Sequence, residues 1–534
     1  MSEGEAAIAP RGGRSLALAV LCVILFLTFL DNTVVSVALG NIQQQLHAGV
    51  SSLQWVVGAY ALTFAGAMLG FGMVGDEFGR KRVMLIGIVI FCGGSIMCAT
   101  ATSVAVLIAG RAVMGFGAAA SEPGTLSMIR HIYTDERERA WALGVWTTVT
   151  GVALAMGPVI GGALIGQHGD WRAIFWFNLA VGAVALIGAF VVLPENADPD
   201  GHRVDIPGSI FSAGALTALA FAVIMAEGSS FGSAPVVALL CLSAASVVAF
   251  FWWESRAPHP LLDLRFIRVP SFLVANVVAF CAYFATFAVF FFTALYLEEV
   301  AGYSGYHIAL VFLPMMILMG AAALLAARST VTIGARATIF TGCLLFALGL
   351  LLTSFAINPN PSYIGLAATL SLTGIGIGFT VVPATSSALS AVPAERSGMA
   401  ASTTNTSREV GAVAGVAVLG ALVSAKLSAN IIARLHQLGL PRSIAQVVIN
   451  GVETGLTPSG GNANGAGGAA GAGQGTLVRE VIHAVYSAFE SGLRAALYLS
   501  AVLVLVAGIF SFFWLGRRQP AEPEAASVEA SSPA

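Results

Sequence analysis

Apolar segments long enough to cross a lipid bilayer recur along almost the whole chain. A transmembrane helix needs about 20 consecutive, mainly apolar residues. Segments of this length run from residue 15 to residue 515. We therefore predict an all-α integral membrane protein with 14 transmembrane helices, at residues 15–39, 53–74, 83–101, 104–129, 140–165, 173–193, 206–225, 235–253, 272–297, 308–326, 337–355, 363–382, 399–422 and 495–515.

The composition excludes a large soluble core. Of the 534 residues, 57% are hydrophobic and 10% are charged, whereas about a quarter of the residues in soluble domains are charged. A soluble chain of this length would divide into domains with polar surfaces. The net charge of -2 does not indicate a nucleic-acid partner, and the 6 cysteines have neither metal-ligand nor disulfide spacing.

The distribution of Lys and Arg sets the direction of the spans. Cytoplasmic loops retain these residues, and most of the 25 lie in alternate connections, on the side of the N-terminus. We therefore expect both termini in the cytoplasm. The first apolar segment follows Arg11 and Arg14, but it is too long for a signal peptide and lacks a cleavage site, so we expect it to remain as a span.

Residues 424–494 form the one large extramembrane segment that the pattern predicts. Its centre, GGNANGAGGAAGAGQG, cannot bury enough apolar surface to become ordered and predicts a flexible linker. Its flanks, LSANIIARLHQLGL and LVREVIHAVYSAFESGL, have helical apolar spacing, and we expect them to lie on the outer surface. Residues 1–14 are predicted as a cytoplasmic tail, and residues 516–534 as a disordered cytoplasmic tail.

Five ionisable residues lie within the predicted spans, where charges are costly and are candidates for function. They are Asp31, Arg111, Glu122, Arg408 and Glu409. At 1.5 Å per residue, Asp31 lies about 12 Å below the outer end of its span and Arg111 about 10 Å below the end of its own. The two side chains could therefore meet, either as a proton-binding pair or as a static ion pair between helices.

Glu122 lies eleven residues after Arg111, so one stripe of the same helix carries both charges. The glutamate precedes Pro123, whose ring removes a backbone hydrogen bond and can expose a carbonyl group. The structural alternative is an interfacial partner of Arg130 or Arg80. Arg408 and Glu409 are adjacent and about 100° apart on a helix, and they favour either transport chemistry or a structural network in a water-accessible interior.

The connection after the second span reads GMVGDEFGRKR and resembles the loop signature of the major facilitator superfamily. The resemblance implies that this loop is a gate between two halves of the molecule, with Gly72, Asp76, Gly79, Arg80 and Lys81 as its signature positions. The glycines permit a tight reversal. Asp76 can accept hydrogen bonds or face the positive N-terminus of another helix. The sequence has Glu77 where arginine is common.

Three further stretches resemble the fourteen-span drug:proton antiporters of that superfamily. LDNTVVSVAL places Asp31 at the family's acidic position, and RAVMGFGAA begins at Arg111 and resembles the proton-movement motif of the fourth span. GVWTTVTGVALAMGPVIGG resembles the antiporter motif of the fifth span, with Ala153 in place of its second glycine. Glycines let helices approach closely and the proline bends the span. The positions in this motif are Gly144, Gly157, Pro158, Gly161 and Gly162.

The resemblance implies the major facilitator fold, with two six-helix bundles and an inserted helix pair. The expected domains are an N-terminal bundle at 15–193, an inserted hairpin at 206–253 and a C-terminal bundle at 272–515. In the family, the first helix of the second bundle borders the central cavity. Aromatic residues recur on one face of the corresponding segment here, and Tyr283 and Phe287 are the candidates for substrate contact, with cation–π attraction for cations. The alternative is a stripe that faces lipid or packs against other helices.

The function that the resemblance implies is proton-coupled efflux of lipophilic, cationic compounds by alternating access. Asp31, Arg111, Glu122 and Glu409 are the candidate proton or substrate residues, and we expect a multi-pass protein of the cytoplasmic membrane of a bacterium. The expected partners are the substrate, protons and lipids. We expect the chain to act as a monomer and to have no metal, cofactor or enzyme activity. The alternatives are a dedicated exporter of an endogenous metabolite, such as an antibiotic, siderophore or lipid, and a non-transporting scaffold or receptor.

Overall fold

The computed structural model describes residues 11–48, 50–165, 170–195, 205–228, 232–258, 260–303, 305–358, 361–393, 396–437 and 474–515, and every regular element in these ranges is a helix. Within them, 13 helices are long and apolar enough to cross a membrane. The remaining predicted span, 140–165, lies in the 30-residue helix α6. The predicted all-α membrane class is confirmed.

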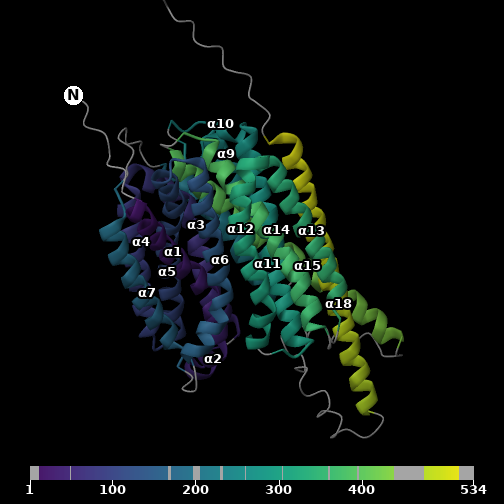
Figure 1. The fold of residues 1–534 in the computed structure, drawn as a ribbon. Helices are drawn as coiled ribbons and strands as arrows, with labels where there is room; N and C mark the ends of the chain where they lie inside the picture. Colours follow the sequence, from purple (N-terminus) through teal and green to yellow (C-terminus); the bar gives the residue numbers. More distant parts are fainter. Residues whose placement is uncertain are drawn as a thin grey trace, which may run out of the picture.

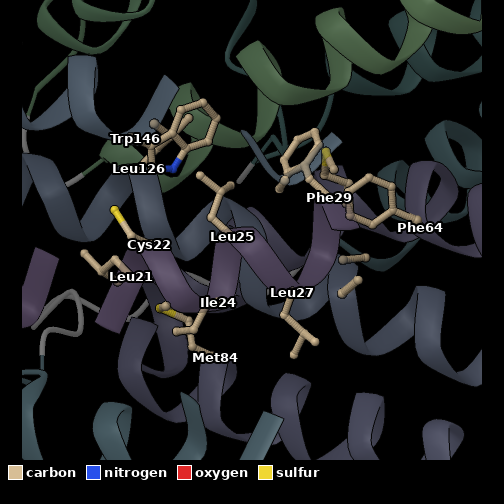
Figure 2. Close-up of a cluster of buried hydrophobic side chains, with 14 of the residues drawn as sticks. Leu21, Cys22, Ile24, Leu25, Leu27, Phe29, Phe64, Met84, Leu126 and Trp146 are labelled. Atoms are coloured by element: carbon tan, nitrogen blue, oxygen red, sulfur yellow. The ribbon is translucent and has the colours of Figure 1, made fainter. Parts of the chain in front are cut away.

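The first group of helices surrounds α1 (Figure 1). Apolar side chains cover α1 on several sides, and Figure 2 shows Leu25 near Trp146 and Leu126, and Ile24 near Met84. A helix that is apolar all round belongs in a protein core or in a membrane. The group consists of α1 (Arg11–Val34), α3 (Val50–Phe78), α4 (Arg80–Ala99), α5 (Val104–Ile132), α6 (Glu136–Ile165) and α7 (Arg172–Val192).

The first predicted span, 15–39, is not one continuous helix. After α1 the chain continues as a 3₁₀ helix, η1 (Val35–Ala38), and then as α2 (Leu39–Leu46). The sequence TVVSV at this point is rich in β-branched residues, which fit an α-helix less well because their χ1 freedom is restricted there. The span therefore changes its helical type where the prediction placed its last turn.

A pair of packed helices, α8 (Ile206–Gly228) and α9 (Ala234–Glu254), follows the first group, and α8 also packs against α3. The second group lies beside the first (Figure 1) and has an apolar cluster of its own, from Val274 to Leu515. Its helices are α10 (Leu264–Ile267), α11 (Pro270–Glu299), α12 (Gly305–Ile333), α13 (Ala335–Ala356), α14 (Tyr363–Ser390), α15 (Ser397–Gln437) and α18 (Gln474–Trp514). We refer to the two groups as the first and second bundles.

Two pairs of helices make the main contacts between the bundles, α6 with α12 and α3 with α15. Small residues let α6 approach α12: the Thr148 hydroxyl donates hydrogen bonds to the carbonyls of Gly144 and, across the interface, Gly320, at 2.8 and 3.2 Å. A side chain on Gly144 would begin 3.1 Å from the carbonyl oxygen of Ala323.

We call the end that holds α10 and the start of α1 the upper face (Figure 1).

The long predicted loop is shorter than 424–494 because helices continue into it from both sides. Both α15 and α18 contain 41 residues, and in Figure 1 the start of α18 extends below the remaining helices while the last turns of α15 project to the right. Leu427 and Ile431 of α15 form an apolar cluster there with Val485 and Ala488 of α18. This packing stabilises the extra turns, so the helical spacing predicted for the flanks belongs to continuations of α15 and α18. Most of the predicted linker, and both predicted tails apart from residues 11–14, lie outside the described residues.

Candidate functional site

A buried ion pair joins α1 to α5. The guanidinium of Arg111 donates to the carboxylate of Asp31, and the two side chains are 1% and 0% exposed. The two charges meet at the depth that the sequence predicted. Asn178 of α7, which the sequence analysis did not select, donates from Nδ2 to Asp31 at 2.7 Å. The sequence feature that could have identified Asn178 is a carboxamide inside an otherwise apolar span.

The remaining faces of Arg111 are also occupied. Its Nε donates to the carbonyl oxygen of Val56 at 3.0 Å, and its guanidinium carbon lies 4.5 Å from the centre of the Tyr60 ring. The Tyr60 hydroxyl donates in turn to the carbonyl of Thr28 at 3.1 Å. A buried charge pair of this kind depends on such additional hydrogen bonds because both ions have lost their water. The cluster therefore holds four helices of the first bundle together.

Glu122 lies near the contact between the bundles and is 2% exposed. Its Oε2 atom accepts no hydrogen bond from the described residues. The charged groups that act on it are Glu409 and Arg408 of α15, in the opposite bundle. The alternative interfacial partners are bonded elsewhere: Arg80 pairs with Asp76, and Arg130 donates to the carbonyl of Val392 at 2.5 Å.

Arg408, one of the five ionisable residues in the predicted spans, lies at the contact between the bundles. Its guanidinium carbon lies 5.1 Å from the Trp146 ring of α6 and 5.3 Å from the Tyr283 ring of α11. It donates to Asn405 Oδ1 at 3.0 Å and to the hydroxyl of Thr385. One side chain therefore contacts aromatic rings from both bundles. Glu409, its neighbour, is partly exposed.

The aromatic face predicted on α11 is divided between different environments. Tyr283 is 8% exposed and faces Arg408. Phe284 is buried in the apolar cluster of the second bundle, whereas Phe291 is 46% exposed. The side chain of Phe287 lies outside the described part of the structure. The regular spacing predicted that these rings share one face of the helix, but it did not distinguish core, interface and outer surface.

The predicted gate loop brings Asp76 to the start of α15. The carboxylate accepts hydrogen bonds from the backbone N–H groups of Gly398 and Met399 at 3.1 and 3.0 Å. Arg80 binds the same carboxylate, with its Nη2 at 2.6 Å. A side chain on Gly72 would collide with Ser402. The expected contact between Asp76 and a helix N-terminus is therefore present.

Two signature positions of this loop have different surroundings. Gly79 has a φ of +100°, a conformation that glycine adopts without strain and other residues rarely adopt. It ends α3 and permits the reversal into α4. Lys81 points away from Asp76, with its Nζ 5.6 Å from the centre of the Phe190 ring of α7. It therefore contributes to the packing of α4 on α7 rather than to the contact with α15.

The glycines of the α6 motif face different neighbours. Gly144 lies against α12 of the second bundle, whereas a side chain on Gly157 would begin 2.9 Å from the backbone nitrogen of Val34 in α1. Gly161 is buried, and a side chain on Gly162 would meet nothing within 4 Å. Pro158 lies within α6, and its ring is outside the described side chains. The motif therefore combines a contact between bundles with one inside the first bundle.

Known proteins resemble this chain over most of its length. "Multidrug resistance protein Stp" of Mycobacterium tuberculosis is 34% identical over 407 residues, which are 76% of this chain and 75% of that protein. "Drug efflux pump JefA" of the same species is 30% identical over 92% of this chain and 95% of that protein. The crystal structure of the human organic anion transporter MFSD10 shares the fold, with a TM-score of 0.58 at 16% identity, over 94% of this chain and 100% of that one.

These likenesses agree with the fold described above. The protein is a multi-pass membrane transporter and not an enzyme. The profile of the Major Facilitator Superfamily matches residues 21–416. The chain therefore belongs to the Major Facilitator Superfamily.

Proposed function

We propose that this protein exports lipophilic, cationic compounds from the cytoplasm in exchange for protons. The observation that carries the proposal is Glu122, a buried carboxyl group at the contact between the bundles with one oxygen that lacks a hydrogen-bond donor among the described residues. Such a group is costly unless it binds a proton or a cation. The names of Stp and JefA, which refer to multidrug resistance and drug efflux, support the outward direction.

Competition between a proton and a cationic substrate for Glu122 would couple the entry of protons to the export of the substrate. The charged carboxylate attracts a proton and a cationic substrate to the same oxygens, so binding of one weakens binding of the other. In this proposal the upper face is cytoplasmic, and it is closed here by contacts such as Asp76 with Met399. Protons that arrive from the lower face neutralise Glu122 and release the substrate. Reopening of the upper face lets Glu122 lose its proton and bind the next substrate.

Asp31 is the second proposed proton site, and it has a stricter requirement. Its carboxylate is 0% exposed and is bonded to Arg111 and Asn178. A proton can reach it only after a conformational change that admits water to α1 and draws Arg111 away. Asp31 would therefore take part in coupling only if this ion pair opens during the cycle, and otherwise it has a structural role.

Reconstitution tests the proposal directly. Purified protein in proteoliposomes should move radiolabelled tetraphenylphosphonium in response to an imposed pH gradient. Glu122→Gln should bind the cation more weakly and lose the dependence on the gradient, because a neutral glutamine resembles the protonated carboxyl group and cannot exchange a proton. Glu138→Gln is the matched control, since Glu138 is an acid at the start of α6 that pairs with Arg14 at 3.1 Å. A full gradient response in Glu122→Gln would remove Glu122 from the mechanism, and Asp31→Asn asks the same of Asp31.

The same proposal assigns the protein to the cytoplasmic membrane of a bacterium, with both termini in the cytoplasm. The concentration of Lys and Arg on the side of the N-terminus supports this orientation. We further propose that a single chain is sufficient and that the proton gradient replaces any cofactor. Reconstitution of the purified chain alone tests sufficiency. A reporter enzyme that is active only in the cytoplasm, fused to the C-terminus, tests the orientation.

A further inference from the structure

Two buried hydrogen-bond donors on α15 have no acceptor among the described residues. They are Nε of Arg408 and Nδ2 of Asn405, and both residues are 2% exposed. They lie one helical turn apart, at the contact between the bundles. Leaving a buried donor unpaired costs about 1–3 kcal/mol, and more when the donor is charged. Such donors therefore indicate a position where an acceptor from another molecule would bind favourably.

The surrounding bonds fix which atoms remain available. A guanidinium group only donates, so the bond from Arg408 Nη1 must end on the carbonyl oxygen of Asn405, which leaves the Asn405 amide nitrogen free. The Thr385 hydroxyl donates to the carbonyl of Val381 at 2.7 Å and can therefore only accept from Arg408 Nη2. Both terminal nitrogens of Arg408 are thus anchored by one hydrogen bond each, whereas its Nε makes none with the described residues.

Aromatic rings from both bundles border these donors. The centres of the Trp146 and Tyr283 rings lie 5.1 and 5.3 Å from the guanidinium carbon of Arg408. Trp146 is itself held by a hydrogen bond from its Nε1 to the Thr125 hydroxyl at 3.0 Å. When the bundles separate, Trp146 moves with the first and Arg408 with the second. A flat ring system can then occupy the space between them.

We propose that Arg408 Nε and Asn405 Nδ2 bind an oxygen acceptor on an aromatic substrate whose cationic group interacts with Glu122. The preferred substrates are therefore flat compounds that carry a carbonyl or phenol oxygen in addition to an amine. This inference rests on the proposed function, because it assumes that a cationic substrate reaches Glu122. It adds a second requirement, an oxygen acceptor, which hydrophobicity and charge alone do not supply.

Two probes separate the requirement for an acceptor from the requirement for a cation. Doxorubicin is an aromatic amine with quinone and phenol oxygens, whereas tetraphenylphosphonium is a cation without any oxygen. Equilibrium binding of both to the purified protein in detergent should be measured for wild type, Arg408→Lys and Asn405→Leu. Loss of a hydrogen bond to a charged donor weakens binding about tenfold or more. We expect that loss for doxorubicin in Arg408→Lys and a smaller one, about two- to tenfold, in Asn405→Leu, whose lost donor is neutral. The change for tetraphenylphosphonium should be less than about twofold.

Arg256→Met is the matched control. Arg256 also lies over a tryptophan, Trp252, at 4.5 Å, but it is exposed and belongs to the segment after α9. Its removal should change the binding of neither probe. Thermal unfolding of each variant shows whether it is folded, and Arg408→Lys keeps the positive charge at this position.

The outcomes distinguish the inference from the proposed function. A loss confined to doxorubicin supports the acceptor site. Equal losses for the two probes, or no loss for either, would overturn it and leave the proposed function in place. Failure of the wild-type protein to bind either probe would count against the proposed function itself.

Discussion

Asp76 at the end of α3 accepts a hydrogen bond from the backbone N–H of Met399 in the first turn of α15, at 3.0 Å. The first N–H groups of a helix have no partner within the helix, and the helix dipole favours a negative charge beside them. Asp76 supplies that charge from the other bundle. A side chain more than 300 positions away in the sequence thereby completes the start of α15 and closes the upper face.

Asp76→Asn should weaken this closure. The amide keeps an acceptor oxygen but loses the charge that interacts with the helix dipole and with Arg80, and a charge at a helix N-terminus contributes up to about 2 kcal/mol. The ratio of closed to open molecules should therefore fall by up to about thirtyfold. Disulfide formation between cysteines introduced at Ser127 and Ser397, whose hydroxyl oxygens are 3.0 Å apart, reports this ratio.

The measurement needs a background in which the 6 native cysteines are replaced. Glu77→Gln is the control, because it removes an adjacent negative charge that makes no hydrogen bond to α15 among the described residues. Its cross-linking rate should match that of the parent protein. An unchanged rate in Asp76→Asn would mean that other contacts close the upper face.

The Asp31–Arg111 pair predicts a non-additive effect on stability. Removal of one member leaves the other as an uncompensated buried charge, which costs about 3–5 kcal/mol. Asp31→Asn and Arg111→Met should therefore each lower the thermal unfolding temperature in detergent markedly. The double variant should recover part of that loss, because no charge remains buried. If the two losses simply add, the ion pair is not the source of the effect.

The sequence was sufficient to predict contacts that depend on depth in the membrane. Asp31 and Arg111 were placed at similar depths by counting residues, and Asp76 was placed at a turn where a helix N-terminus could reach it. Both contacts are present. Depth, however, does not specify which face of a helix meets which neighbour. Arg408 was therefore recognised as a costly charge without any indication that Trp146 of the other bundle packs against it.

The extent of α15 and α18 was missed for a different reason. Hydropathy marks the length of a helix that lies within the membrane. The helix itself ends only where its hydrogen bonds or its packing end. Leu427 and Ile431 have helical spacing, but their partners, Val485 and Ala488, lie beyond the long connection. The spacing indicated two amphipathic helices. It could not show that each continues a span and that the two pack against each other.

Asp263 predicts a dependence of stability on pH. Its carboxylate is 5% exposed and binds Arg265 at 2.7 Å and Arg396 at 2.9 Å, which joins the segment before α11 to the start of α15. The hydrogen bond from Arg265 holds the pKa of Asp263 below its usual range. A lowered pKa in the folded state contributes stability above the unfolded pKa of about 3.9, and this contribution is lost as the pH falls through the folded pKa.

Asp263→Asn should therefore unfold at a lower temperature than wild type by a constant difference between about pH 5 and 8. That difference should begin to shrink as the pH falls below about 4 and should disappear once the pH is below the lowered pKa of the folded state. Asp170→Asn serves as control, because Asp170 is largely exposed and lies 3.7 Å from Arg172, and exposed pairs contribute little. A difference that persists unchanged into acid would assign the effect to the shape of the side chain rather than to its charge.

Gly157 and Gly162 belong to one motif on α6, but the structure predicts opposite tolerance at the two positions. A methyl group on Gly157 would lie 2.8 Å from Cβ of Thr33 and 2.9 Å from the backbone nitrogen of Val34. The backbone of α1 cannot yield as a side chain can, so α6 must move away from it. Overpacking of this kind typically costs about 1–3 kcal/mol, and Gly157→Ala should lower both the unfolding temperature and the rate of transport.

Gly162→Ala should be neutral or slightly stabilising, because nothing lies within 4 Å of the added methyl group and alanine favours a helix over glycine by about 1 kcal/mol. Unfolding temperature and initial rate of transport should be compared for the two variants in the same detergent and lipid. Equal sensitivity at both positions would mean that the glycines serve to bend α6 around Pro158. Sensitivity at Gly157 alone would mean that its role is to let α6 approach α1.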